Sequence, residues 1–221
     1  DARHAGPHPH GGSLDGAVHG PADRRSDLDG ARSIDDSAAV GAGDLGAGYL
    51  PDDLGRPRAA AARDAVLRAA PDVHVRDAHR PDLVVITDVV VPDPTVVSDL
   101  TATRIPHLMA YALEGKAAVG PLVWPGRSSC LHCAELHRAE VDLAWPKLAA
   151  QMVGRIPAAG LAATLLVAAW AAEQTLTALA GPGAGLPVPP TWGATLELDP
   201  VQGTLQRHAR PAHPRCGCGA G

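Results

Sequence analysis

Two close pairs of cysteines place the strongest constraint on how this chain can fold. Cys130 and Cys133 form a C-x2-C pair, and Cys216 and Cys218 form a C-x1-C pair near the end of the 221 residues. Each short spacing lets two thiolates reach a single ion, and the long gap between the pairs is then the domain that the metal closes. The four cysteines therefore predict one tetrahedral zinc site. Its role should be structural, since four thiolates leave no open position for water.

The same cysteines could instead form two disulfides, and nearby histidines could replace a thiolate. We favour zinc because the chain shows no signal peptide, and unpaired cysteines in a cytoplasmic protein of this size are more typical of a metal site. His213 could substitute for a cysteine of the second pair. His132 and His137 flank the first pair, where we expect them to be exposed residues near the start of a helix.

Charge and hydropathy exclude two classes of partner. A net charge of −5, a pI of about 6.1 and the lack of a basic patch interleaved with aromatic residues argue against binding to nucleic acid. The longest apolar run, residues 158–172, is shorter than the roughly 20 residues that span a bilayer, so it predicts a buried core helix and no membrane span. The hydrophobic fraction of 46% is enough for one sizeable core, although the chain has no Phe.

Residues 1–33 differ from the rest of the chain. They contain four histidines and many Gly and Asp residues, but hardly any apolar residue and no helical or strand periodicity. This composition predicts a disordered, solvated segment and not a metal-binding one. Because the chain does not begin with Met, a fragment or a misread first part of the gene would also explain it. We expect one folded domain over residues 34–221.

The segment Gly41-Ala-Gly-Asp-Leu-Gly46 matches the G-x-G-x-x-G pattern of dinucleotide-binding loops. That function requires a preceding strand and a helix that opens within the motif, so that helix N–H groups face the pyrophosphate. Nothing strand-like precedes Ile34, and Pro51 interrupts any helix that follows. We therefore do not expect a phosphate loop here.

Helix and strand patterns alternate through the middle of the chain. The β-branched run Asp82–Asp88 is typical of a strand buried on both faces of a parallel sheet. The alternation predicts an α/β fold, a Rossmann-like, mostly parallel sheet with helices on both faces, plus a zinc knuckle and a C-terminal β-hairpin. We expect helices at 58–70, 94–101, 143–152 and 157–180, and strands at 73–76, 82–88, 106–113, 116–124, 192–198 and 204–208.

The order of these features resembles the ThiF/MoeB superfamily, the ATP-dependent adenylating enzymes related to ubiquitin-activating enzymes. The stretch Pro125-Gly-Arg-Ser-Ser-Cys-Leu-His-Cys133, with Trp145-Pro146 and Ala150-Gln151 behind it, more narrowly resembles actinobacterial ThiF-like proteins. These are grouped with the cyclodehydratases and leader-peptide-binding proteins of thiazole/oxazole-modified peptide pathways. The resemblance covers about residues 34–221, and its other carriers are Asp36, Val40, Asp44-Leu45, Asp53-Leu-Gly-Arg-Pro-Arg58, Asp82–Asp88, Val119-Gly-Pro and the last two cysteines.

The resemblance implies an ATP site and gives three residues a role in it. Asp36 fits the acid that binds the ribose hydroxyls, although a turn Asp would look the same. Asp88, at the end of its strand, fits the carboxylate that holds Mg²⁺ beside the phosphates. Arg58 stands where relatives have a phosphate-binding lysine, and arginine can pair with phosphate in a different geometry.

Several departures from the superfamily pattern bear on this ATP site. Ala47 stands where relatives have an arginine, Val89 stands where they often have an asparagine, and the first strand with its glycine-rich loop is not found in residues 1–33. Since all four cysteines are committed to the metal, we expect no thioester step. Ser128 and Ser129 have no His/Asp arrangement to activate them, so we expect turn residues.

The resemblance therefore implies a ThiF-like adenylyltransferase-family protein that uses ATP and Mg²⁺ to activate the carboxylate of a peptide or small carrier protein with a free C-terminus. The alternative, favoured by the departures, is a non-catalytic, zinc-stabilised module that binds a peptide or leader for a partner enzyme. A Rossmann oxidoreductase using NAD or FAD would leave the four cysteines unexplained. Relatives tend to be homodimers, and the apolar helix at 157–180 could serve that interface.

Overall fold

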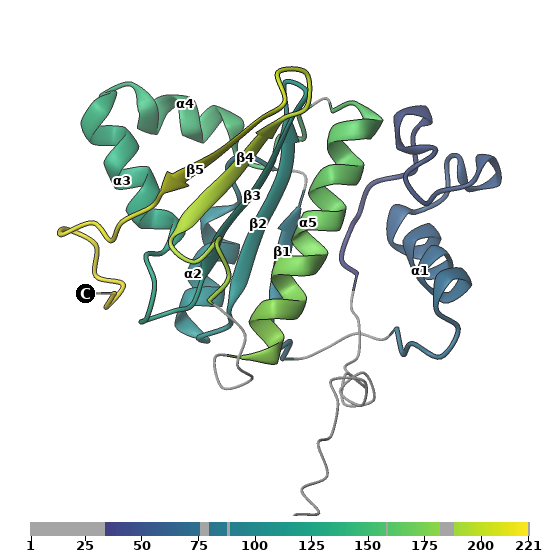
Figure 1. Ribbon diagram of the computed structural model, residues 1–221, viewed down its shortest axis with the longest axis horizontal. Coiled ribbons are helices and arrows are strands. Elements are labelled where there is room, and N and C mark those ends of the chain that lie inside the picture. Colours follow the sequence, from purple (N-terminus) through teal and green to yellow (C-terminus); the bar gives the residue numbers. More distant parts are fainter. Residues whose placement is uncertain (1–33, 76–79, 88, 158, 182–187, 221) are drawn as a thin grey trace, which may run out of the picture.

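The computed structural model describes residues 34–75, 80–87, 89–157, 159–181 and 188–220, and a five-stranded mixed sheet forms their centre (Figure 1). β1 and β2 are parallel, whereas the remaining neighbours are antiparallel, so the prediction of a mostly parallel sheet is wrong. The strands lie across the sheet in chain order: β1 (Val84–Thr87), β2 (His107–Leu113), β3 (Lys116–Val123), β4 (Ala194–Asp199) and β5 (Thr204–Ala209).

The connections between the strands explain why the sheet is mixed. β2 and β3 are joined by Glu114 and Gly115, whose φ angles of 53° and 80° suit the tight turn of an antiparallel hairpin. β4 and β5 form a second hairpin, which confirms the one predicted near the C-terminus. Parallel neighbours need a longer crossover connection, and the segment with α2 provides one between β1 and β2. The connection from β3 to β4 is longer and contains α3, α4 and α5, but it returns the chain antiparallel to β3.

β1 lies at an edge of the described sheet instead of its centre. The run Asp82–Asp88 predicts burial on both faces, but the side chains of β1 alternate between half-buried and exposed, and Val85 is 36% exposed. Among the described strands, β1 pairs with β2 alone. The β-branched run therefore indicates strand propensity here and not burial on two sides. Residues 73–75, part of the strand expected at 73–76, belong to no strand of the sheet.

Helices pack on both faces of the sheet, as the sequence predicts. Successive side chains of β2 point to opposite faces. Leu108 packs in one cluster with Val167 of α5, while Met109 packs on the other face with Leu131 of α3 and Val97 of α2. Figure 1 shows α5 on one side of the sheet and α3 and α4 on the other. The helices are α1 (Arg58–Ala69), α2 (Pro94–Ala102), α3 (Leu131–Val141), α4 (Trp145–Met152) and α5 (Leu161–Ala180).

The long apolar helix α5 begins later than predicted, at Leu161, and is buried on one side only. By length and composition alone it could cross a membrane. Val167 and Ala171 on its inner side belong to the core beneath the sheet, whereas Leu165 and Leu176 are each 47% exposed. The prediction of a core helix therefore holds for the inner side of α5.

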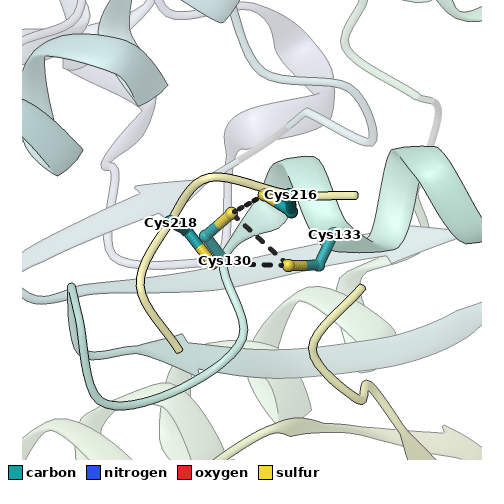
Figure 2. A group of neighbouring side chains, drawn as sticks. All are labelled: Cys130, Cys133, Cys216 and Cys218. Carbon is teal, nitrogen blue, oxygen red and sulfur yellow. Dashed lines mark hydrogen bonds between the residues drawn. The ribbon is translucent and has the colours of Figure 1, made fainter. Parts of the chain in front are cut away.

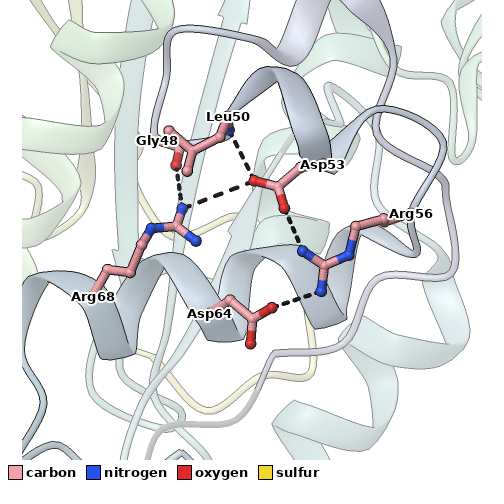
Figure 3. A network of polar contacts seen from close by, with 6 residues as sticks. All are labelled: Gly48, Leu50, Asp53, Arg56, Asp64 and Arg68. Carbon is pink, nitrogen blue, oxygen red and sulfur yellow. Dashed lines mark hydrogen bonds and ion pairs between the residues drawn. The ribbon is translucent and has the colours of Figure 1, made fainter.

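The described residues before β1 form a small unit built on α1 and held together by ion pairs (Figure 3). The side chain of Asp53 is 3% exposed, accepts the N–H of Leu50 at 2.8 Å and pairs with Arg56. Arg56 also reaches Asp64 of α1 at 2.6 Å. The Leu50 N–H, together with Arg56 and the nearby Arg68, holds the pKa of the Asp53 carboxyl below its ordinary value although burial opposes this. These contacts fasten the loop before α1 onto that helix.

Candidate functional site

The four cysteines come together between α3 and the C-terminal tail (Figure 2). Cys130 is the N-cap of α3 and Cys133 lies in its first turn, while the other two cysteines follow β5. The Sγ atom of Cys130 lies 3.8 Å from that of Cys133 and 3.6 Å from that of Cys216. The Sγ atoms of Cys133 and Cys218 are 3.6 Å apart, and all four sulfur atoms lie within 4.8 Å of one another.

These separations suit a tetrahedral zinc ion. Zinc–sulfur bonds of about 2.3 Å in a tetrahedron place neighbouring sulfur atoms about 3.8 Å apart. The three separations of 3.6 to 3.8 Å match this spacing, and all four thiols are free, so the disulfide alternative does not describe this arrangement. The predicted ligands Cys130, Cys133, Cys216 and Cys218 could therefore bind one zinc ion and join the tail to α3.

The surroundings of the thiols favour a cation. Burial raises the pKa of Cys130, and it also raises that of Cys216. Burial acts in the same direction on Cys218, but hydrogen bonds with the Ala220 N–H and with the other thiols lower its pKa to about 7. A cluster of thiolates in a buried position is costly unless positive charge compensates it, which a divalent ion supplies and the N-terminus of α3 supports.

The histidines near the cluster are engaged elsewhere. The Nδ1 atom of His213 accepts the N–H of Arg215 at 3.1 Å, and its Nε2 atom lies 3.1 Å from Oε1 of Glu140 on α3. This geometry assigns the ring proton to Nε2. His137 packs edge-on against His213, with 4.6 Å between the ring centroids, and His132 is exposed. The candidate metal ligands are therefore the four sulfur atoms, and no histidine is among them.

The two serines before Cys130 are structural, as predicted for turn residues. The Oγ atom of Ser128 accepts the N–H of Trp124 at 2.7 Å, and the Oγ atom of Ser129 donates to the backbone carbonyl of Arg210. Both side chains are buried. They hold the cysteine knuckle against the sheet and against the end of β5.

A cavity of about 880 Å³ adjoins the cysteines, between α2, α3, α4 and the sheet. This volume lies in the range of small-molecule and peptide-side-chain pockets. Much of its wall is apolar and comes from Val91, Val97, Met109, Leu131, Ala149 and Val153. Its charged side chains are Glu135, Arg138 and Arg210, and its other polar side chains include Tyr111, Thr195, His132, Ser98, Thr101 and three of the cysteines, Cys130, Cys216 and Cys218. The cavity therefore combines an apolar wall with a basic corner, which is formed by Arg138 and Arg210.

Arg210 carries the least compensated charge of that corner. Its Nε atom donates to Oγ1 of Thr195 at 3.0 Å, and no carboxylate of the described residues forms an ion pair with it. Burial lowers the pKa of Arg210, and the positive charge of Arg138 adds to this effect. Arg138, in contrast, pairs with Glu135 at 2.8 Å and lies 4.9 Å from the centroid of the Trp145 ring.

No sequence motif contains Arg138, Arg210 or Tyr111 as a candidate functional residue. Arg138 lies on the helix that begins after Cys130, and Arg210 lies shortly before the second cysteine pair, so closeness to the cysteines was the one sequence signal for them. Only the start of that helix was predicted from the sequence. Three residues from three separate elements leave no local motif in the sequence.

The structure describes two of the three residues that were expected to bind the nucleotide. The structure brings Asp36 and Arg58 together, with 3.1 Å between Oδ2 and Nε, and Asp36 also accepts the N–H of Ala38 at 2.9 Å. Asp88 lies outside the described residues. The roles of Asp36, Arg58 and Asp88 in ATP binding therefore stay predictions.

The glycine-rich segment Gly41–Gly46 has the structure expected of a turn. It contains the 3-10 helix η2 (Ala42–Asp44), and a second 3-10 helix, η3 (Pro51–Asp53), follows it. No α-helix opens within this segment and no strand of the sheet precedes it among the described residues. Its backbone therefore does not present the N–H groups of a helix to a phosphate.

Comparison with known proteins gives a match in structure but not in sequence. Neither family models nor curated proteins match this chain. Escherichia coli MccB with ATP matches with a TM-score of 0.67 and 17% identity, over 87% of this chain and 59% of MccB. MccB in complex with N-formylated MccA matches with a TM-score of 0.67 and 16% identity, over 86% and 60%.

A heterocyclase in complex with substrate and cofactor matches less closely, with a TM-score of 0.53 and 14% identity, over 86% of this chain and 25% of the heterocyclase. The present chain thus spans about three fifths of the length of MccB. At these identities the likeness establishes the fold alone. The chain shares its fold with the matched part of MccB.

Proposed function

We propose that this protein acts on a peptide or small carrier protein as a ThiF-like adenylyltransferase, activating a free carboxylate with ATP and Mg²⁺. The observation that carries this proposal is the fold match over most of the chain to MccB, which has been solved both with ATP and with the peptide MccA. In the proposed reaction the carboxylate attacks the α-phosphorus of ATP, an acyl adenylate forms and pyrophosphate leaves.

Some residues of this chain would bind the nucleotide, and others would stabilise the fold. Asp36 would accept hydrogen bonds from the ribose, Arg58 would pair with phosphate, and Asp88 would hold the Mg²⁺ ion. The set of four cysteines would bind structural zinc and hold the C-terminal tail in place. Cytoplasmic location and a homodimer belong to the same proposal.

A second candidate is a non-catalytic peptide-binding module. Two observations favour it: Asp36 and Arg58 already pair with each other at 3.1 Å, and the segment Gly41–Gly46 forms a turn and not a phosphate loop. In this case zinc would stabilise the fold and the cavity would bind a peptide for a partner enzyme.

Calorimetry of the zinc-loaded full chain with ATP and Mg²⁺ tests the two candidates. For an adenylyltransferase we expect micromolar binding that weakens at least ~10-fold in Asp36→Ala and in Asp88→Ala, because each removes a charged hydrogen-bonding or metal-binding group. Asp99→Ala is the matched control, since Asp99 is exposed on α2, and it should bind ATP as the wild type does. No ATP binding by folded, zinc-loaded protein would contradict the enzyme and support the module.

A further inference from the structure

The cavity beside the cysteines differs from a generic apolar pocket because two arginines and one glutamate line it. Arg138 and Arg210 both line it, and they are close enough for the charge of Arg138 to lower the pKa of Arg210. Glu135 is the carboxylate in the described wall, but both of its oxygens have partners: one pairs with Arg138 at 2.8 Å and the other accepts the Trp145 indole N–H at 2.6 Å.

The other acidic side chain near Arg210 is also occupied. Glu197 on β4 pairs with Lys116 at 2.9 Å. The phenol of Tyr111 lines the cavity and makes no hydrogen bond with another described residue, so its hydroxyl can donate to a ligand. The thiolates of Cys130, Cys216 and Cys218 also line the cavity and would be committed to zinc. One guanidinium and one hydroxyl are therefore available to a ligand beside them.

We infer that this cavity binds a peptide segment in which one carboxylate lies next to apolar side chains, with the carboxylate held by Arg210 and Tyr111. A half-buried guanidinium without an acidic partner gains most from a carboxylate, because charge-assisted hydrogen bonds strengthen where water is excluded. The apolar wall, which includes Val97, Met109 and Leu131, takes the neighbouring side chains.

The carboxylate could come from two sources, the C-terminus of the peptide or an Asp or Glu side chain within it. Both present the same group to Arg210. A short apolar peptide fits the volume of about 880 Å³ in either case. This inference rests on the proposed peptide substrate, but it concerns binding in the absence of ATP.

Binding of three acetylated tripeptides to the zinc-loaded full chain, measured by calorimetry without nucleotide, tests the inference. The first is Leu-Val-Leu with a free carboxyl terminus, the second is Leu-Glu-Leu amide, and the third is the neutral Leu-Gln-Leu amide. We expect at least one of the two acids to bind at least ~10-fold more tightly than the neutral peptide. The tighter acid identifies the source of the carboxylate.

Two variants connect that preference to the basic corner. Arg210→Gln should reduce the preference for the acid by about 10-fold, while Arg210→Lys should retain part of it because the charge remains. Arg207→Gln is the matched control on β5, since Arg207 reaches the carbonyl oxygen of Pro190 at 3.1 Å and does not line the cavity. It should leave the preference unchanged.

Filling the cavity provides an independent check. Ala149→Phe should weaken all three tripeptides, provided that zinc content and circular dichroism show a folded protein. Equal binding of neutral and acidic peptides, no binding of any of them, or an unchanged preference in Arg210→Gln would overturn the inference. Acid-selective binding by a protein that does not bind ATP would uphold it and reject the adenylyltransferase, so the two proposals fail separately.

Discussion

Cys130 and Cys133 are almost wholly buried, with 6% and 0% of their surface exposed, although thiolates are polar ligands. Such burial is favourable when a metal neutralises the charge, and the binding energy of the metal then becomes folding energy. Replacing Cys130 with Ser should therefore release zinc and lower the melting temperature by on the order of 10 °C. Elemental analysis of the purified protein and thermal unfolding followed by circular dichroism measure both effects.

His213 offers the matched comparison for this residue. Its ring contacts Arg215 and Glu140 instead of the sulfur cluster, so His213→Gln should keep its zinc even if the tail loosens. Unchanged metal content in Cys130→Ser would rule out the zinc site. Loss of zinc in His213→Gln would show that the histidine is a ligand.

A second single residue couples stability to pH. His107 on β2 is 0% exposed, and its Nδ1 atom lies 3.0 Å from the carbonyl oxygen of Ile105, which assigns the ring proton to Nδ1. Burial lowers its pKa below the ordinary value of 6.5. Below that pH the unfolded chain takes up a proton that the folded protein does not, so the folded state loses stability until the folded-state pKa is reached.

We expect His107→Leu to flatten the pH dependence of the free energy of unfolding between about pH 7 and 5. One proton contributes a slope of up to about 1.4 kcal/mol per pH unit, and the variant removes that contribution. His74→Leu, at an exposed position, is the control. Urea unfolding at several pH values, on protein whose zinc content is monitored, measures the slopes. The same slope in His107→Leu as in the wild type would contradict the assignment.

At the scale of the elements, β3 contains an extra residue opposite β2. The register places Gly120 and Pro121 together opposite Met109, which is the pattern of a β-bulge. Gly120 has φ 102°, and a Cβ atom there would overlap the carbonyl oxygen of Ala194 and crowd the side chain of Thr191. The bulge therefore allows β3 and β4 to approach only when this position has no side chain.

Gly120→Ala should destabilise the protein by at least ~2 kcal/mol, since it adds a steric overlap with backbone to the strain of a left-handed conformation. Gly115→Ala is the matched control: its φ is 80°, but nothing lies within 4 Å of the added methyl group. We expect only ~1 kcal/mol for that variant. Urea unfolding measures both. Equal losses would show that the contact with β4 does not matter.

At the scale of the whole molecule, the sheet separates two regions with different expected roles. The unit on α1, which contains Asp36 and Arg58, lies beyond α5 (Figure 1). The side chain of Leu161 on α5 comes close to Gly46 of that unit. The cysteines and the cavity lie on the opposite face, under α3 and α4. Substitutions at Asp36 or Arg58 therefore test the proposed nucleotide site without changing the wall of the cavity.

The parts of the fold that sequence predicted depend on local chemistry. Pro94 begins α2, the run of Ala residues forms α1, and the hairpin of β4 and β5 appears where alternating residues flank a turn. Local sequence did not determine whether neighbouring strands pair in parallel or antiparallel. The run Asp82–Asp88 indicates a strand, but its neighbours and its exposure depend on where the connections carry the chain.

For the site, the cysteine spacing alone determined that four sulfur atoms could share one ion, because a thiolate pair separated by one or two residues can reach a single metal in almost any fold. Only the tertiary structure decided what lies beside the four cysteines. Arg138 on α3, Arg210 after β5 and Tyr111 on β2 are far apart in the sequence and meet through packing of helices on the sheet. Their charge balance depends on which carboxylates that packing leaves near them, and this is a property of the folded protein.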